Sequence, residues 1–400
     1  MTPSLSQLAT TLAETHPTPS DQAPEQKVVQ NLVNRDFHEH DMYWGGFRIN
    51  HMVHKLYSQW VLGANAERLR ELYESSKYLE PAHTSNVAIT KDNWDQYLGE
   101  RSHVPAFLRF FDDQVTQLGF DPSIGVWVPK LFNRWLGSLT HPLIHLGYAV
   151  EFQDRTTLVE AFTMAATSQI LTPSFTKAPE LTGFQPTTDP GQVLKAAVND
   201  PLLKVTRGEG TFRARLMDLE SSPVQDRIRQ WVDQWDVQVS DDMLPTQLHQ
   251  LAVLVSGIYI SPRSPEDRPD FFLAHAVTSL FAAHIVLPLL DHSHRKSLLR
   301  EWLETTLLVY VVQGQVPILL PGEEGSGKGF YLPESYRKLT ETALHEKIRR
   351  MTVDNNDDHA CKVVRAMFYF EKVYGKSQGL FLQAGLKTVD RVPGSEQWAF

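Results

Sequence analysis

Residues 140–151 form an apolar stretch that carries two histidines and begins like an α-helix. Thr140 can cap such a helix, and Pro142 suits its first turn, where a missing backbone N–H costs nothing. His141 and His145 are four residues apart, so on a helix their rings lie within about 40° of each other. Two imidazoles on one apolar helical face are either buried histidines that hydrogen-bond to their neighbours or ligands for a metal ion.

Apolar residues recur at helical spacing along most of the chain. The spacing predicts helices over residues 48–63, 65–78, 104–118, 142–152, 154–170, 192–198, 224–237, 244–256, 271–290, 295–312, 334–351 and 357–373. Residues 121–137 are rich in aromatic side chains and are expected to be irregular. Strand signals are few, the best being residues 316–320, and alternating strand–helix units are absent.

The composition allows a large core, because 42% of the 400 residues are hydrophobic. We therefore predict an all-α fold in which residues 26–400 form a single large domain of packed helices with long irregular loops. Residues 1–25 are polar and rich in Thr, Pro and Ser, so they are expected to form a flexible N-terminal arm.

Charge and cysteine content exclude several classes of protein. The net charge of −9 argues against nucleic acid as a partner, because phosphate binding requires clustered Lys and Arg. The single cysteine, Cys361, excludes an internal disulfide and favours a reducing compartment, so we expect a cytoplasmic protein. The N-terminus lacks the pattern of a secretory signal. The most apolar run, residues 271–290, contains two histidines, so it predicts a buried helix and no membrane partner.

Three further helical stretches place histidines among apolar residues. They contribute the pair His51 and His54, the single His275, and His359 with Lys362 three residues later. His284 lies nine residues after His275, about 180° around the same helix, and cannot face the same centre. Two other clusters are not expected to bind a metal. His38 and His40 have the spacing of ligands on a strand, but no strand signals surround them. The cluster at 291–294 is expected to be a solvated turn.

Helical bundles build metal sites from inward side chains on facing helices, and imidazole suits iron, zinc, copper and nickel. Neither His-Glu-x-x-His nor Glu-x-x-His occurs at these positions, so the usual carboxylate ligand is missing. Lys362 is one candidate to replace it. A buried lysine favours its neutral form, and a neutral amine can take up CO2 as a carbamate with anionic oxygens. The alternative is an ordinary lysine whose stem is buried and whose amine reaches solvent.

Residues 322–328 fit the pattern Gly-x-x-x-x-Gly-Lys, but Gly329 stands where a phosphate-binding loop needs Ser or Thr. Two acidic residues occupy the positions where a phosphate would lie, so we interpret the segment as a flexible loop. The fingerprint Gly-x-Gly-x-x-Gly is absent, so no flavin is expected.

Four blocks of the sequence together resemble the questin oxidase-like family. They are Asn-His-Met-Val-His at 50–54 with Leu-Gly-Ala at 62–64, the stretch around His-Pro-Leu-Ile-His-Leu-Gly at 140–152, His-Ala-Val-Thr-Ser at 275–279, and His-Ala-Cys-Lys-Val-Val-Arg at 359–365. They follow the order expected of the family over most of the chain. His-Pro-Leu-Ile-His-Leu-Gly is the most specific of them.

The resemblance implies an oxygenase of polyketide metabolism. Members of the family open a ring of anthraquinones such as questin, giving benzophenone-type products, or act in related aflatoxin-type pathways. The reaction is Baeyer–Villiger-like and uses O2, NADPH is the candidate electron donor, and the implied metal is non-haem iron. The expected partners are therefore an aromatic polyketide substrate and O2.

Carried over to this chain, the resemblance implies that Fe(II) is held by four histidines with Lys362 as a fifth ligand. The candidates for the four are His51, His54, His141, His145 and His275. His359 is expected either to bind the metal or to orient a ligand. No catalytic group beyond the metal centre is assigned. Tyr57, Tyr148, Trp127 and Trp135 are the expected walls of an apolar substrate pocket.

Three alternatives remain open on the sequence. The first is a metal-free NADPH-dependent monooxygenase in which the histidines act as acids and bases. The second is a non-catalytic helical binding protein, although polar rings on apolar faces carry a cost that a scaffold has no reason to bear. The third is a nucleotide-binding protein that uses residues 322–328.

Overall fold

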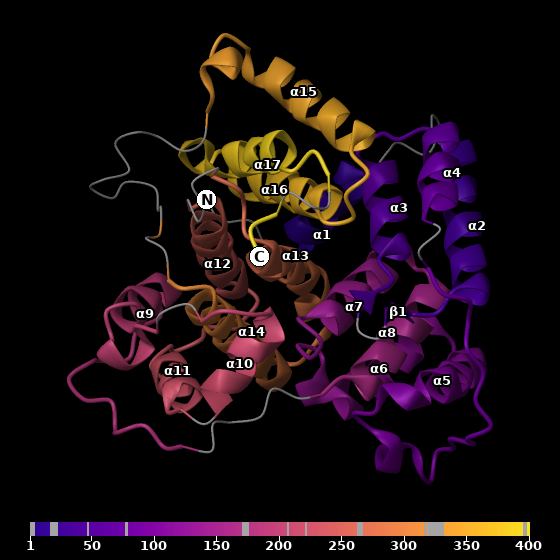
Figure 1. Cartoon of the computed structure of the whole chain (residues 1–400), viewed down its shortest axis with the longest axis horizontal. Helices are drawn as coiled ribbons and strands as arrows, with labels where there is room; N and C mark the ends of the chain where they lie inside the picture. The colour runs from indigo at the N-terminus through magenta and orange to yellow at the C-terminus, as the bar shows by residue number, and fades with distance from the viewer. Residues whose placement is uncertain are drawn as a thin grey trace.

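The computed structural model describes residues 5–16, 23–45, 48–76, 79–169, 176–205, 208–220, 222–261, 267–315, 318, 332–394 and 398–400. Within these residues the chain is a single domain of α-helices with one two-stranded sheet, so the all-α prediction is confirmed. The helices pack around α13, which lies near the centre of Figure 1.

The first half of the chain supplies helices α1–α8 and the small sheet. Their bounds are α1 (Leu5–Thr15), α2 (Ala23–Glu39), β1 (Tyr43–Trp44), β2 (Arg48–Ile49), α3 (Met52–Val61), α4 (Ala66–Ser75), α5 (Val104–Leu118), α6 (Phe120–Lys130), α7 (His141–Phe152) and α8 (Arg155–Thr167). The strands pair antiparallel, with Tyr43 opposite Ile49. Asp154 caps α8, because its carboxylate accepts the backbone N–H of Thr157 at 2.8 Å.

The second half supplies helices α9–α17. Their bounds are α9 (Pro190–Ala197), α10 (Phe212–Glu220), α11 (Val224–Asp233), α12 (Leu244–Ile260), α13 (Phe271–Val286), α14 (His292–Val312), α15 (Glu341–Asp354), α16 (Ala360–Tyr374) and α17 (Leu380–Arg391). Short 3₁₀ helices cover Trp94–Tyr97, Arg101–His103, Phe132–Arg134, Pro201–Leu203, Leu287–Leu289, Glu334–Tyr336 and Ser377–Gly379. Asp270 caps α13 through the backbone N–H of Leu273.

Several elements differ from the sequence predictions. Part of the expected flexible arm, Leu5–Thr15, is helix α1, which contacts α16. The segment expected to be irregular contains α6. Helices α2, α10 and α17 were not predicted, because charged and polar residues alternate with the apolar ones in α2 and α10 and because α17 has Gly385 in its interior. The strand expected at 316–320 lies outside the described residues except for position 318, as does the loop 322–328.

The helices that carry the singled-out histidines contact one another in a ring. Helix α3 contacts α7 and α16, and helix α13 contacts the same two helices from the other side. Phe271–Leu289 is long and apolar enough to cross a membrane by length and composition, but 78% of this segment is buried inside the protein. It is therefore a core helix, as predicted.

Helices α7 and α13 approach closely at Gly147. A Cβ atom on Gly147 would lie 2.6 Å from the Cβ and 2.9 Å from the Cα of Ala282. These are distances that no side-chain adjustment can relieve, because Ala282 contributes its backbone to the contact. Since α7 carries His141 and His145 and α13 carries His275, this glycine sets the spacing between the two histidine-bearing helices.

We expect the substitution Gly147→Ala to lower the free energy of unfolding by about 1–3 kcal/mol, because it overpacks this contact. Gly385→Ala is the matched control within a helix, since the added Cβ would meet only the Cβ of Met367 at 3.8 Å. The control should be neutral or stabilising by up to about 1 kcal/mol. Urea denaturation followed by circular dichroism measures both, and equal stability of the two variants would contradict the close approach.

Candidate metal centre

Four histidines from four helices meet in the core. His51 precedes α3, His141 begins α7, His275 lies in α13 and His359 precedes α16. One ring nitrogen from each of these residues lies within 4.8 Å of all the others, and we call this set the four-histidine group. His51 is partly exposed and the other three are buried. This arrangement can hold one cation.

Backbone carbonyls fix the tautomers of two members of the group. His141 Nδ1 lies 2.7 Å from the carbonyl oxygen of Ser138, and His275 Nδ1 lies 2.9 Å from that of Phe271. A carbonyl can only accept, so each Nδ1 carries the proton and donates it. Each Nε2 is then left with its lone pair, as in histidines that bind a metal.

The Nε2 atoms of His51 and His141 lie 2.8 Å apart. The lone pair of His141 Nε2 therefore either accepts an N–H from His51 Nε2 or shares a cation with it. Metal–imidazole distances are about 2.0–2.1 Å, so neighbouring ligands on one ion are about 3 Å apart. The observed separation therefore fits a shared ion.

The turn before α7 has an unusual backbone. Ser138, Leu139 and Thr140 have φ values of 45°, 54° and 65°, all in the left-handed region. Each costs about 1–2 kcal/mol for a residue other than glycine. The turn places the carbonyl of Ser138 against the ring of His141 and the hydroxyl of Thr140 within 3.4 Å of the carbonyl oxygen of His275. The strained backbone of residues 138–140 therefore lies in the turn that orients His141 within the four-histidine group.

The remaining predicted ligands, His54 and His145, form a second layer that we call the histidine pair. Their ring centroids are 4.2 Å apart, and His54 also lies 5.7 Å from His51. Among the described residues, no hydrogen-bond partner lies within reach of either ring nitrogen of His54 or of Nδ1 of His145. The structure therefore brings all six histidines together but separates them into four and two.

Glu160 of α8 is a carboxylate near this cluster that the sequence analysis missed. Its Oε2 lies 3.7 Å from His145 Nε2 and has no hydrogen-bond partner within the residues that the structure describes. Burial raises the pKa of Glu160 well above its ordinary value. Because burial also lowers the pKa of His145 to about 3, we treat them as two neutral groups rather than an ion pair. The signal in the sequence was one acidic residue inside the apolar stretch 158–162.

The histidines are held in the neutral form that a metal ligand requires. Burial is the main cause that lowers the pKa of every member of the cluster, and the charge on Lys362 lowers each further. The affected residues are His51, His54, His141, His145, His275 and His359. For His275, as for His145, the pKa falls to about 3.

Lys362 lies one turn into α16 and points into the same region. Lys362 is 1% exposed, and its Nζ has no hydrogen-bond partner in the described part of the chain. Burial lowers the pKa of the amine to about 8. The burial of Lys362 argues against the alternative of an ordinary lysine whose amine reaches solvent, and the lowered pKa increases the fraction of neutral amine near physiological pH.

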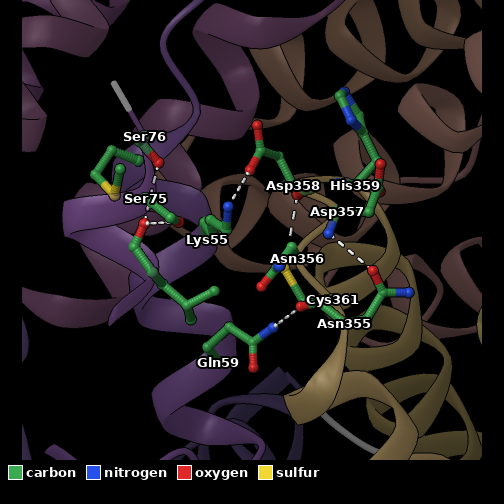
Figure 2. A network of polar contacts seen from close by, with 12 residues as sticks. Lys55, Gln59, Ser75, Ser76, Asn355, Asn356, Asp357, Asp358, His359 and Cys361 are labelled. Carbon is green, nitrogen blue, oxygen red and sulfur yellow. Dashed lines mark hydrogen bonds and ion pairs between the residues drawn. The ribbon is translucent and has the colours of Figure 1, made fainter. Parts of the chain in front are cut away.

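A polar network fixes α3 against the start of α16 (Figure 2). The ammonium of Lys55 lies 2.8 Å from the carboxylate of Asp358. One turn along α3, the amide of Gln59 donates to the carbonyl of Asn355 at 3.2 Å. Asp357 accepts the backbone N–H of His359 at 2.8 Å. The network holds the histidines of α3 in register with His359 and Lys362.

The expected substrate pocket is only partly near the histidines. Tyr148 lies 4.8 Å from His54, centroid to centroid, and donates to or accepts from the hydroxyl of Ser58. Tyr57 stacks on Phe152 at 4.0 Å, one layer further away. Among the ring contacts of the described residues, those of Trp127 and Trp135 do not include a histidine of the cluster.

The two tryptophans belong to the hydrophobic core instead. Trp127 contacts Phe110 and Phe111, and Trp135 packs beside Phe162 and donates its N–H to the carbonyl of Val128.

As predicted, His284 faces away from the cluster. Its Nε2 lies 2.8 Å from the hydroxyl of Tyr374.

The fold and site define an all-α protein with a buried histidine cluster at the junction of four helices. The chain belongs to the questin oxidase-like family, whose model matches residues 49–367. This span includes every histidine of the cluster and Lys362.

Relatives of this chain carry names of oxidases. It is 22% identical over 385 residues to a protein named questin oxidase from Aspergillus fumigatus, covering 87% of this chain and 81% of the relative. It is 24% identical over 354 residues to oxidoreductase AflY from Aspergillus parasiticus, covering 82% and 69%. It is 21% identical over 369 residues to Baeyer-Villiger monooxygenase AacuH from Aspergillus aculeatus, covering 81% and 74%. The family and the names of these relatives place the chain among oxidoreductases.

Proposed function

We propose that this protein is an O2-dependent oxygenase that cleaves a ring of an anthraquinone-type polyketide at a non-haem iron centre. The observation that carries the proposal is the four-histidine group, in which ring nitrogens from four helices converge within 4.8 Å in the core. The relatives named questin oxidase and Baeyer-Villiger monooxygenase support the reaction class.

The residues present fit a metal ion. The four-histidine group offers neutral nitrogens, and His359 Nε2 has no other partner among the described residues. Imidazole suits both iron and zinc, but Zn²⁺ has no redox chemistry, so of these two ions iron is the one that can take part in an oxidation. When bound, Fe(II) supplies the electron that O2 needs before it reacts with a closed-shell organic substrate.

Lys362 is the proposed source of an anionic ligand. Its neutral amine attacks CO2, a C–N bond forms, and one proton leaves, giving a carbamate with a negative charge. Both rings of the histidine pair are neutral and have nitrogens without hydrogen-bond partners among the described residues, so each ring has one N–H that can donate to a carbamate oxygen. The start of α16 lies here, and helix N-termini favour negative charge.

Glu160 has a different proposed role. At 3.7 Å from His145, it is placed to hold that ring rather than to reach the four-histidine group. A carboxyl group beside a histidine fixes the orientation of the ring. We therefore assign Glu160 as a positioning residue for the histidine pair.

The side chains of the protein contribute mainly by placement. Burial of the histidine cluster excludes water from the reacting atoms, and Tyr148 limits the space beside His54. Insertion of one oxygen atom next to a ring carbonyl breaks the C–C bond and forms a C–O–C link. The second oxygen atom leaves as water with two electrons and two protons, for which NADPH or a hydroquinone form of the substrate is the proposed donor.

The metal-free alternative is less well supported. A general acid or base works best with a pKa near the operating pH. The pKa of His145 and of His275 is about 3, so these rings are poor proton carriers at neutral pH. A non-catalytic scaffold would bury these unpartnered rings at a cost and gain nothing from them.

The reaction is tested with the Fe(II)-loaded protein, questin and ¹⁸O2, with and without NADPH. We expect a ring-opened product that contains ¹⁸O, detected by mass spectrometry, and no product from the Zn(II)-loaded protein. If no anthraquinone in a panel around questin is consumed by the iron-loaded protein, the proposed reaction is wrong. Turnover by the protein after removal of all metal would instead favour the metal-free alternative.

A further inference from the structure

Aromatic side chains extend outward from the four-histidine group. Phe271 lies 4.5 Å from His359 and 5.0 Å from His275, centroid to centroid. On its other side it contacts Phe272 at 5.3 Å and Phe400 at 4.9 Å. Phe271 and Phe272 are partly exposed, and Phe400 is 52% exposed. Such exposure is unusual for a phenylalanine in direct contact with metal-binding candidates.

The segment Trp398–Phe400 is fastened to this place by its backbone. The N–H of Phe271 donates to the carbonyl of Ala399 at 2.9 Å, and the N–H of Ala399 donates to the carbonyl of Pro269 at 3.0 Å. The two bonds form a parallel bridge between Asp270 and Ala399. The segment therefore lies beside the beginning of α13, which carries His275.

The indole of Trp398 fastens the same segment to α16. Its N–H donates to Asp357 Oδ2 at 3.1 Å, and the side chain is 3% exposed. Asp357 Oδ1 accepts the backbone N–H groups of His359 and Ala360 at 2.8 and 2.7 Å. Trp398–Phe400 thus connects two of the segments that supply the four-histidine group, although the family match ends at residue 367.

We propose that Phe271 and Phe400 form a stacking face that binds the planar aromatic substrate beside the four-histidine group. This inference rests on the proposed function, since it names the residues that bind its substrate class. His51, the partly exposed member of the group, lies 4.6 Å from the His359 ring on which Phe271 packs. A fused-ring substrate stacked on these side chains would lie near that exposed histidine. Trp398 is the positioning residue, because it fixes the segment without being exposed itself.

The test is equilibrium binding to the Fe(II)-loaded protein without O2, so that no turnover occurs. The probes are dihydroxyanthraquinone, which is planar, and dihydroxybenzophenone, which is twisted. We expect Phe400→Ala to weaken binding of the planar probe roughly 3- to 10-fold, the range of an aromatic pair. Binding of the twisted probe should change little, and the Phe400→Trp variant should bind the planar probe about as tightly as the wild type. Leu289→Ala, a substitution of another exposed apolar residue (53%), is the control.

The possible outcomes are distinguishable. If the wild type binds the planar probe and Phe400→Ala binds it equally well, the stacking face is wrong and the proposed function stands. If the wild type does not bind the planar probe, both the proposed substrate class and the stacking face fail. If Phe400→Ala changes the oligomeric state in sedimentation velocity and leaves affinity unchanged, the face is an interface between copies, and the inference is overturned.

Discussion

Replacing His275 with alanine is expected to reduce bound iron from about one per chain to a trace and to lower oxygenase activity at least about 100-fold. The ring is buried, its Nδ1–H is fixed by the carbonyl of Phe271, and its Nε2 faces the four-histidine group. Removing it leaves three imidazoles and a gap on the α13 side. Iron content is measured by inductively coupled plasma mass spectrometry, and activity is measured by product formation from questin.

His284→Ala is the matched control for this prediction. His284 lies on the same helix and is also buried, but its ring contacts Tyr374 and Phe370 rather than the cluster. Both variants remove a buried ring and should lose stability, so circular dichroism will not separate them. Only His275→Ala should lose iron. Equal iron content in the two variants would contradict the assignment of the four-histidine group.

Replacing Lys362 with methionine is expected to have the second large effect. Methionine keeps the apolar stem but cannot form a carbamate, so the centre loses its proposed anionic ligand. We expect iron-dependent activity to fall at least about 10-fold, and about 100-fold if the carbamate binds iron directly. In the wild type, ¹³C-bicarbonate should give a carbamate carbon signal in the NMR spectrum of the Zn(II)-loaded protein, which has no paramagnetic ion.

Lys387→Met supplies the comparison for a buried lysine outside the centre. Lys387 is 1% exposed and donates to the carbonyl of Ile260. The Lys387→Met variant should be less stable than the wild type but should keep the ¹³C carbamate signal. A wild-type spectrum without the signal, or a signal that persists in Lys362→Met, would show that Lys362 is not carboxylated.

The helical spacing of apolar residues and histidines in the sequence predicted the all-α fold and many of the residues in the site. His141 and His145 are four residues apart and His51 and His54 are three apart, and these spacings correctly predicted that each pair lies toward the cluster. The spacing of nine between His275 and His284 correctly predicted that His284 faces away from it. The spacing of residues on one helix does not predict how that helix packs against the others. The structure therefore decides that His51 and His141 approach to 2.8 Å while His54 and His145 form a second layer.

The site residues that were misjudged have physical reasons. His54 and His145 were expected among the metal ligands, but the packing of α3 against α7 places them in the histidine pair. His359, which was expected either to bind the metal or to orient a ligand, completes the four-histidine group instead. Trp127 and Trp135 were assigned to a pocket from aromatic content, which cannot distinguish a pocket wall from a core. Glu160 and the aromatic contacts of Phe271 depend on tertiary packing between segments far apart in sequence.

The central claim is that the four-histidine group holds one iron ion. It is tested most directly by the metal content of the purified wild-type protein after anaerobic reconstitution with Fe(II) and removal of loosely bound ions. We predict about one iron per chain, retained through gel filtration. A protein that retains no metal under these conditions would contradict the claim and leave the buried histidines without the ion that their convergence implies.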